Sequence, residues 1–416
     1  MFKHRFLRLL GPGMLYAGAA IGVSHLVQST RAGAEFGFEL LGILLITNIF
    51  KYPFFEMGSR YVLARGSNLV DAYADAGKWI LILFLGMTLI TMAPIQAALT
   101  IVTAGLSNNI FGAQWSDFDM SVAITIITLI LLVVGKFKML DNLIKVVILL
   151  MTISTVVAVI VALGRWQGET MITTTFDWSN RTNILFLVAF IGWMPAPVDI
   201  VVWTSIWSQA KFENLGFKPT LREVLLEYRI GYFGTMIVAA FFLALGALVM
   251  YGTGEAMPAG GAAFAEKLVG MYTQTIGHWA YPVIAIAALT TMFSTTITVL
   301  DAIPRTLVEC FRRLSDGKLN FKPQLQYFMW MLVLAASALI LLKISGRSMR
   351  TMVDLATSIS FVTAPFLAYL NYRIIYSKAI PSEFRPGIFL KVWAWAGLIM
   401  LSAFTLFYLY VLILPA

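Results

Sequence analysis

Uncharged apolar runs of about 20 residues recur along the whole chain, and they set the strongest limit on its fold. A run of this length, wound into a helix, crosses the hydrocarbon core of a bilayer, which is roughly 30 Å thick. Of the 416 residues, 59% are hydrophobic and only 12% are charged, whereas charged residues make up about 25% of an average soluble domain. The pattern therefore predicts a polytopic membrane protein and excludes soluble, disordered and disulfide-scaffold classes.

Windows of about 19 residues predict eleven transmembrane spans. The first is interpreted as a membrane span and not as a cleaved signal peptide, because its apolar stretch continues without charge as far as Arg31. The predicted spans cover residues 7–33, 37–58, 79–106, 120–135, 142–163, 182–208, 230–251, 280–303, 325–342, 350–375 and 389–412.

The positive charges divide unevenly between the two sides that eleven alternating spans define. Most of the 30 Lys and Arg residues fall on one side; Lys51 lies inside a span, and the other side receives only Arg31, Arg165, Arg181, Lys267, Lys343, Arg347 and Arg350. Cytoplasmic loops carry the excess of Lys and Arg. We therefore expect a multi-pass protein of the plasma (inner) membrane, with its N-terminus in the cytoplasm and its C-terminus outside. The net charge of +9 needs no nucleic-acid partner, because cationic loops beside the lipid bilayer account for it.

Two spans are interrupted by residues that helices tolerate poorly. The first reads GPGMLYAGAAIGVSHLVQSTRAGAEFGF, and the sixth reads ILFLVAFIGWMPAPVDIVVWTSIW, with Pro195 and Pro197 two apart. Proline removes an amide donor and clashes with the preceding turn, so we expect span six to unwind near residues 193–197. Unwound backbone at membrane depth is tolerated only where it is buried in protein or lines a cavity. Two proline-kinked helices that merely pack well are the simpler alternative.

The two interrupted spans lie five spans apart, an arrangement typical of transporters built from inverted repeats. We expect one transmembrane transporter domain over residues 1–416, with a first repeat at 1–163, a second at 182–376 and a peripheral helix at 389–412. In such transporters the substrate binds where the two breaks face each other.

The stretch GPGMLYAGAAI, followed by RAGAEFGFELLGILLITNI, resembles the opening of the Nramp family of proton-coupled divalent-metal transporters. The similarity extends to Met194 and Pro195 in span six and to FSTTITVLDAIPRTLVECF in span eight. The resemblance implies an all-α, LeuT-type fold of two inverted five-helix repeats, with about 11 transmembrane helices and with segments one and six broken. It also implies alternating access around these two segments, and a monomer.

The sequence departs from the family where the family binds metal. Aligned on GPG and AGA, the family's Asp-Pro-Gly-Asn falls on Gly22, Val23, Ser24 and His25, and the acidic residues of its third span have no counterpart. The liganding methionine is kept at Met194, the neighbouring histidine becomes Ala196, and a glutamine of the tenth span falls at about Thr357. Hard dications want carboxylate oxygens. The loss of the only carboxylate at the break therefore argues against a bare transition-metal dication and against proton coupling by the family's route.

Residues at the breaks have structural and functional interpretations. His25 is either a substrate or proton contact or a buried polar residue bonded to freed carbonyls. Asp199, just after the break, is either a residue favoured there by the helix dipole or a carboxylate that takes over some of the charge lost at Gly22, in a pair with His25. Met194 is either a soft ligand or core packing. The expected substrate-binding residues are Gly22, Ser24, His25, Trp193, Met194, Ala196, Asp199 and Thr357.

The leading hypothesis is an Nramp-related secondary transporter whose rebuilt central site accepts a small organic solute. The alternative is a Mn²⁺- or Mg²⁺-type transporter that uses His25, Met194 and backbone carbonyls, with Asp199 as a further weak candidate. A non-transporting Nramp-like sensor is a third interpretation, although the chain carries no cytosolic extension of the kind known in such proteins. One Cys and three scattered His predict no metal cluster, and there is no phosphate loop, no HExxH motif and no carboxylate pair. We therefore expect neither an enzyme nor a bound cofactor.

Overall fold

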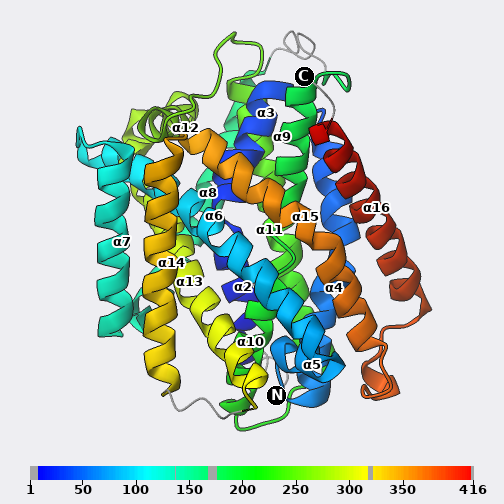
Figure 1. Ribbon diagram of the computed structural model, residues 1–416. Helices are drawn as coiled ribbons and strands as arrows, with labels where there is room; N and C mark the ends of the chain where they lie inside the picture. The colour runs from blue at the N-terminus through cyan, green and yellow to red at the C-terminus, as the bar shows by residue number, and fades with distance from the viewer. Residues whose placement is uncertain (1–7, 136, 167–175, 317–321, 414–416) are drawn as a thin grey trace.

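The computed structural model of the protein describes residues 8–135, 137–166, 176–316 and 322–413. Lys3, Arg5, Lys136 and Lys318, which enter the predicted charge bias, lie outside the described residues. All secondary structure within the described ranges is helical. The helices form one bundle, and the two ends of the described chain lie at opposite ends of it (Figure 1).

Seven helices of the described chain are each long and apolar enough to cross a membrane, and each coincides with a predicted span. The 3₁₀ turn η2 (His278–Ala280) leads directly into one of them. The seven are α6 (Lys78–Phe111), α7 (Asp117–Val134), α11 (Leu221–Val249), α13 (Tyr281–Leu314), α14 (Pro323–Ser345), α15 (Met349–Ile375) and α16 (Ile388–Ile413).

The other four predicted spans are helical as well. α4 (Leu41–Arg65) covers the second span and carries Asn48, Lys51 and Glu56, which lower its hydropathy. α8 (Phe137–Arg165) covers the fifth, and the first and sixth are the interrupted segments described next. All eleven predicted spans therefore coincide with helices. The connecting helices are α5 (Leu69–Ala76), α12 (Gly261–Ile276) and η3 (Ser382–Phe384).

Segment one is broken at its middle, as the sequence predicts. α2 (Pro12–Ala20) ends before a bend at Ile21 and Gly22, and the chain then continues as a π-helix, η1 (Ser24–Ser29), and as α3 (Thr30–Phe36). A π-helix is rare and occurs mostly as a single turn, often at a functional site. The bend leaves backbone carbonyls near Gly22 without the regular partners of an α-helix.

Segment six is broken over seven residues, which also confirms the prediction. α9 (Arg181–Gly192) ends before Trp193, and α10 (Ile200–Glu213) begins after Asp199. Pro195 and Pro197 lie inside this non-helical stretch. Proline supplies no amide hydrogen and disfavours helical backbone in the residue before it, so the paired prolines explain why the helix does not continue.

Glycines hold both halves of segment one close to α11. A Cβ on Gly13 would lie 2.7 Å from the Glu227 carbonyl oxygen, and one on Gly33 would lie 1.9 Å from the Leu243 carbonyl oxygen. From the other side, a Cβ on Gly246 would lie 2.3 Å from the Thr30 carbonyl oxygen. Small residues at such crossings let two backbones approach closely inside a membrane. The GPG and AGA stretches are therefore packing sites against α11.

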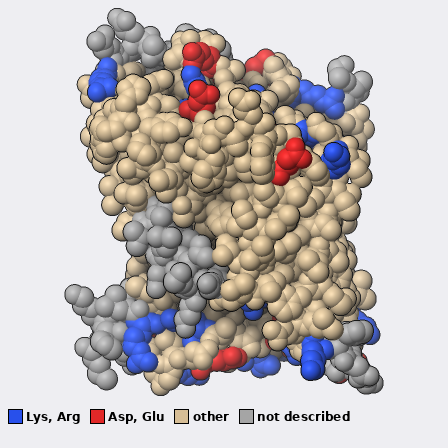
Figure 2. Space-filling model, turned by 90° about the vertical axis from the view of Figure 1, so that its left-hand side faces the viewer, with Lys and Arg blue, Asp and Glu red and all other residues tan. Residues whose placement is uncertain are grey.

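The surface has the polarity of a membrane protein. On the face shown in Figure 2, the Lys, Arg, Asp and Glu side chains gather at two rims, and a broad uncharged belt separates them. α16 packs against α4 and α15 at the edge of the bundle (Figure 1). An uncharged belt is what contact with hydrocarbon requires, and the protein is a multi-pass membrane protein.

Candidate functional site

The interruptions of segments one and six meet at a small cavity, called here the central cavity. Its volume is about 30 Å³, which is room for about two water molecules. Four helical segments supply its walls: segment one, α6, segment six and α13. The lining residues are Ala19, Ala20, Val23, Ser24, Ile95, Leu99, Trp193, Ala196, Pro197, Ile200, Trp203, Thr295 and Val299.

The walls of the central cavity are apolar except for hydroxyl and indole groups. Ser24 and Thr295 bring hydroxyls, and no carboxylate, thiol or imidazole lines the cavity. Trp193 is 4% exposed, and its indole N–H has no hydrogen-bond partner among the described residues. A buried donor without a partner costs free energy. Trp193 therefore brings an unpaired donor to the wall around the cavity, and the lining residues include no anionic ligand.

Ser24 joins the two breaks. Its hydroxyl lies 2.7 Å from the Ala20 carbonyl oxygen and 3.4 Å from the Pro195 carbonyl oxygen, so that one side chain contacts freed backbone of both segments. The same hydroxyl lies 2.7 Å from Nδ1 of His25. A hydroxyl has one hydrogen to donate and two lone pairs, so these contacts are alternatives for its proton.

His25 is fully buried and contacts protein through both ring nitrogens. Nε2 lies 2.9 Å from the Thr235 carbonyl oxygen, which can only accept, so this nitrogen donates. In the neutral ring, Nδ1 then accepts from Ser24. The ring also meets Phe242 edge-on at 6.5 Å. His25 is directed toward α11 and does not line the central cavity.

The remaining predicted site residues lie around the cavity in different roles. Gly22 packs on α13, where an added Cβ would lie 2.7 Å from the Thr295 hydroxyl oxygen. Met194 is fully buried, and its sulfur accepts from the Ser29 hydroxyl at 3.7 Å. The Thr357 hydroxyl donates within its own helix, to the Val353 carbonyl oxygen at 2.9 Å. Neither Met194 nor Thr357 lines the cavity, whereas Ala196 does.

Asp199 does not pair with His25, because both nitrogens of that ring are bonded elsewhere. Its charge interacts instead with that of Lys51, which lies inside α4. The Lys51 ammonium donates to the Ile191 carbonyl oxygen at 2.7 Å and to the Gly192 carbonyl oxygen at 2.9 Å. Lys51 was not among the residues predicted for the site. The available signal was its position, since it is a lysine well inside a predicted span.

A second charged group, around Arg31, joins helices of the bundle on the C-terminal side of the segment-one break. Arg31 is 2% exposed, and its Nη1 lies 2.8 Å from Asp354 Oδ1 on α15. Gln28 donates to the same carboxylate oxygen at 3.0 Å. The guanidinium lies 4.7 Å from the ring centre of Phe186 on α9. These contacts tie segment one to α15 and α9.

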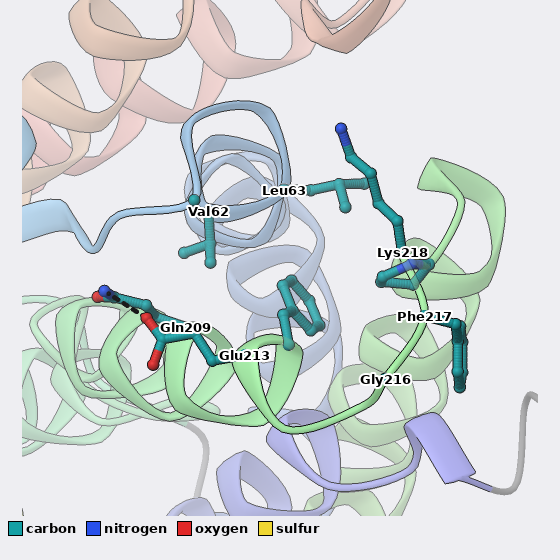
Figure 3. Close-up of a pocket in the computed structure, with 10 residues that line it drawn as sticks. Val62, Leu63, Gln209, Glu213, Gly216, Phe217 and Lys218 are labelled. Carbon is teal, nitrogen blue, oxygen red and sulfur yellow. Dashed lines mark hydrogen bonds between the residues drawn. The ribbon is translucent and has the colours of Figure 1, made fainter.

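A larger pocket lies at the ends of helices, away from the breaks. It has a volume of about 480 Å³ and lies between the end of α4, the end of α10 and the chain leading to α11 (Figure 3). Gln209 donates to Glu213 at 3.1 Å on its wall. None of the predicted site residues lines it; the lining residues are Val62, Leu63, Gly66, Gln209, Phe212, Glu213, Gly216, Phe217, Lys218 and Pro219.

A metal-binding cluster of the usual kind is not found in the described part of the chain. No group of three or more His, Cys, Asp and Glu side chains there is placed to hold a metal ion. Near the central cavity, the ligand atoms that remain for a cation are the Met194 sulfur, hydroxyls and backbone carbonyls, while the one carboxylate at the breaks, Asp199, does not line the cavity. Such a set suits a hydrated ion better than a bare one, because hard cations favour carboxylate oxygens.

Comparisons with known proteins agree with this architecture. The sequence profile of the Nramp family, described as natural resistance-associated macrophage protein-like, matches residues 13–411. An uncharacterized protein of Pasteurella multocida, PM0681, is 34% identical over 98% of this chain and 93% of its own length. The divalent metal cation transporter MntH of Listeria monocytogenes is 22% identical over 98% of this chain and 91% of its own length.

Solved structures show the same fold. A mutant of the manganese transporter of Eremococcus coleocola superposes with a TM-score of 0.74 at 16% identity, covering 98% of this chain and 87% of that chain. The transporter MhsT, solved with L-phenylalanine, gives a TM-score of 0.62 at 16% identity, covering 96% of this chain and 98% of that chain. The predicted LeuT-type fold is thereby confirmed. The chain therefore belongs to the Nramp family and is a secondary membrane transporter of that family.

Proposed function

We propose that the substrate of this transporter is a small solute that presents hydrogen-bond acceptors, and that it is not a dehydrated transition-metal dication. The observation that carries this proposal is the unpaired indole N–H of Trp193 beside the central cavity. A donor repels a cation and attracts an acceptor such as a carbonyl or carboxylate oxygen. The hydroxyls of Ser24 and Thr295 can serve the same solute.

The charges near the cavity support the same conclusion. The position aligned with the family's acid is Gly22. The Asp199 carboxylate, just after the second break, is close enough to the Lys51 ammonium for the two charges to interact. A bare dication would have to give up its hydration shell without an anionic ligand in return. A neutral or zwitterionic solute requires no such compensation. The cavity of about 30 Å³ must widen for it, as alternating access around a central site allows.

A hydrated divalent ion is the second candidate, and the relatives favour it. The Listeria monocytogenes protein and a Brucella suis protein, which is 24% identical over 72% of this chain and 66% of its own length, are both described as divalent metal cation transporters. An ion that keeps most of its water, such as Mg²⁺, asks least of direct ligands. In this chain the Met194 sulfur, the Ser24 hydroxyl and freed carbonyls would surround it.

Uptake by purified protein in liposomes separates the two candidates. Mn²⁺ and Mg²⁺ entry is followed with an enclosed indicator, and binding of a panel of neutral, zwitterionic and anionic solutes is followed by titration calorimetry. We expect binding of one solute class, weakened about tenfold by Trp193→Phe, because one hydrogen bond is worth about 1.4 kcal/mol. Trp279→Phe, at a side chain that is 70% exposed, is the matched control. Saturable Mn²⁺ or Mg²⁺ uptake with no solute binding would favour the second candidate.

We also propose the finer organisation that the sequence predicts. Residues 1–163 and 182–376 form the two repeats, the protein acts as a monomer, and the end of the bundle that carries the N-terminus faces the cytoplasm across the plasma membrane. The opposite placement of the chain ends supports an odd number of crossings (Figure 1). Reporter fusions at either end and light scattering of the purified protein test these points.

A further inference from the structure

Lys51 is a lysine buried in the interior of the bundle. Its side chain is 0% exposed and lies in the middle of α4, one of the helices that cross the membrane. An ammonium at membrane depth is costly unless other groups replace its water. Residues of this kind are rare and generally have a function, so the groups around this ammonium indicate what it does.

The ammonium binds the broken end of α9. It donates to the Ile191 carbonyl oxygen at 2.7 Å and to the Gly192 carbonyl oxygen at 2.9 Å. Since α9 ends at Gly192, these carbonyls belong to the last turn of a helix and lack the regular α-helical amide partners; the Ile191 carbonyl oxygen accepts a longer bond from the Met194 amide, at 3.3 Å. The C-terminal end of a helix also carries partial negative charge. Two of the three ammonium hydrogens therefore supply hydrogen bonds to a helix end whose carbonyls are otherwise only partly satisfied.

The other side of the same break carries the complementary charge. Asp199 directly precedes Ile200, the first residue of α10, and the N-terminal end of a helix carries partial positive charge. Asp199 Oδ1 is buried and has no hydrogen-bond partner among the described residues, while its charge interacts with that of Lys51. Tyr73 on α5 is also within electrostatic range of the Asp199 carboxylate. Its hydroxyl does not bind that carboxylate and donates instead to Asn371 Oδ1 at 2.7 Å.

We propose that Lys51 is a tethered cation, whose ammonium occupies the carbonyl site at the segment-six break that would otherwise draw a free cation from solution. Freed carbonyls at a half-helix C-terminus are the ligands with which broken transporter helices coordinate ions. In this chain a side chain supplies the charge permanently, and Asp199 balances it. The site is thus complete without a bound monovalent ion. This inference concerns the break itself and does not depend on which substrate occupies the central cavity.

Chemical rescue of a truncated variant tests the proposal. Lys51→Ala removes the ammonium and the methylenes that carry it, and leaves two carbonyls and Asp199 without the cation. Unfolding of the detergent-purified protein is followed by tryptophan fluorescence in propylammonium chloride, sodium chloride and propan-1-ol, with ionic strength held constant by N-methylglucamine chloride. We expect a lowered melting temperature that propylammonium raises saturably, with a smaller rise in sodium and none in propan-1-ol. The wild type and Lys78→Ala, at an exposed lysine, should not respond.

Three further variants make the test decisive. Asp199→Asn in the Lys51→Ala background should weaken the propylammonium response, because the balancing charge is gone. Lys51→Met keeps the length of the side chain without its charge and should be less stable than Lys51→Arg, which keeps the charge. The proposal is overturned if Lys51→Met is as stable as the wild type, or if Lys51→Ala folds and no cation stabilises it. If Lys51→Ala does not fold in any salt, the comparison of Lys51→Met with Lys51→Arg decides. The proposal is then also overturned if Lys51→Arg is as unstable as Lys51→Met.

Discussion

Arg31 Nη1 lies 2.8 Å from Asp354 Oδ1, and this contact joins the second half of segment one to α15. The arginine is 2% exposed while the side chain of the aspartate is 31% exposed. Removal of the aspartate would therefore leave the more deeply buried partner with only the longer contact from its Nε to Glu35 Oε1, at 3.7 Å, as counter-charge, which is more harmful than the loss of a surface pair. Gln28 and Phe186 hold the guanidinium in place.

We predict that Asp354→Ala lowers the free energy of unfolding by about 2 kcal/mol, because Glu35 still offsets part of the Arg31 charge, and increases access to the segment-one break from the side of Arg31. Access is measured with a cysteine at Ser24 in a Cys310→Ser background, as the rate of labelling by a membrane-impermeant thiol reagent. Arg31→Met combined with Asp354→Ala should be less destabilised than the sum of the single variants. Additive effects and an unchanged labelling rate would show that the pair does not hold this side closed.

Restoration of an acid at Gly22 should not restore the family's metal site. A Cβ at Gly22 would lie 2.7 Å from the Thr295 hydroxyl oxygen, so even Gly22→Ala should cost about 1–3 kcal/mol of unfolding free energy through overpacking. Gly22→Asp should cost at least as much and should bind Mn²⁺ no better than the wild type by titration calorimetry. Thr295→Ala should recover part of the lost stability.

The control for this prediction is Gly42→Ala. An added Cβ at Gly42 meets nothing within 4 Å, and alanine is a better helix former than glycine by roughly 0.5–1 kcal/mol. Gly42→Ala should therefore be neutral or slightly stabilising in the same unfolding assay. Equal effects at the two glycines would contradict the crowding attributed to Thr295.

Glu227 caps the first half of segment one across the bundle. Its carboxylate accepts from the Gly11 amide at 3.0 Å and from the Gly13 amide at 2.8 Å. Because a carboxylate near a helix N-terminus is worth up to about 2 kcal/mol when partly buried, Glu227→Gln should lower the unfolding free energy by about 1–2 kcal/mol. Glu213→Gln, at an exposed position, should leave it unchanged. The readout is the melting temperature at fixed pH and detergent.

Cys310 should be inert in the folded protein. It is 0% exposed on α13, and thiols in apolar surroundings react poorly because the thiolate is disfavoured there. A maleimide should label the native protein at a rate at least about tenfold below that of the denatured protein. Rapid labelling under native conditions would mean that α13 opens locally.

The sequence predicted the breaks because their cause is local. Single prolines lie inside α4, α6, α13 and α15, but Pro195 and Pro197, two residues apart, remove two amide donors and disfavour helical backbone before each of them. Apolar runs of membrane length are recognised without knowledge of their neighbours. The π-helix after Gly22 was not predicted, since nothing within Ser24–Ser29 distinguishes it from an α-helical turn. The segment packs against α11, which is distant in the chain.

The contacts of the candidate site could not be predicted, because its partners are distant in the chain. The Thr235 carbonyl that binds His25 is 210 residues away, and the Ile191 carbonyl that binds Lys51 is 140 residues away. The hypothesised partnership of Asp199 with His25 rested on their nearness to the two breaks. In the fold, the His25 imidazole is directed toward α11. The charge that interacts with Asp199 is instead the Lys51 ammonium on α4.

The glycine crossings at Gly13 and Gly33 restrict how this transporter can change shape. Both halves of segment one touch α11 backbone to backbone, one near each end of the crossing. A half-helix packed in this way cannot tilt toward α11, because even a small tilt in that direction would drive main-chain atoms into one another. Hinge motion at Ile21 and Gly22 is therefore restricted to directions along α11 or away from it, unless the seventh span moves as well.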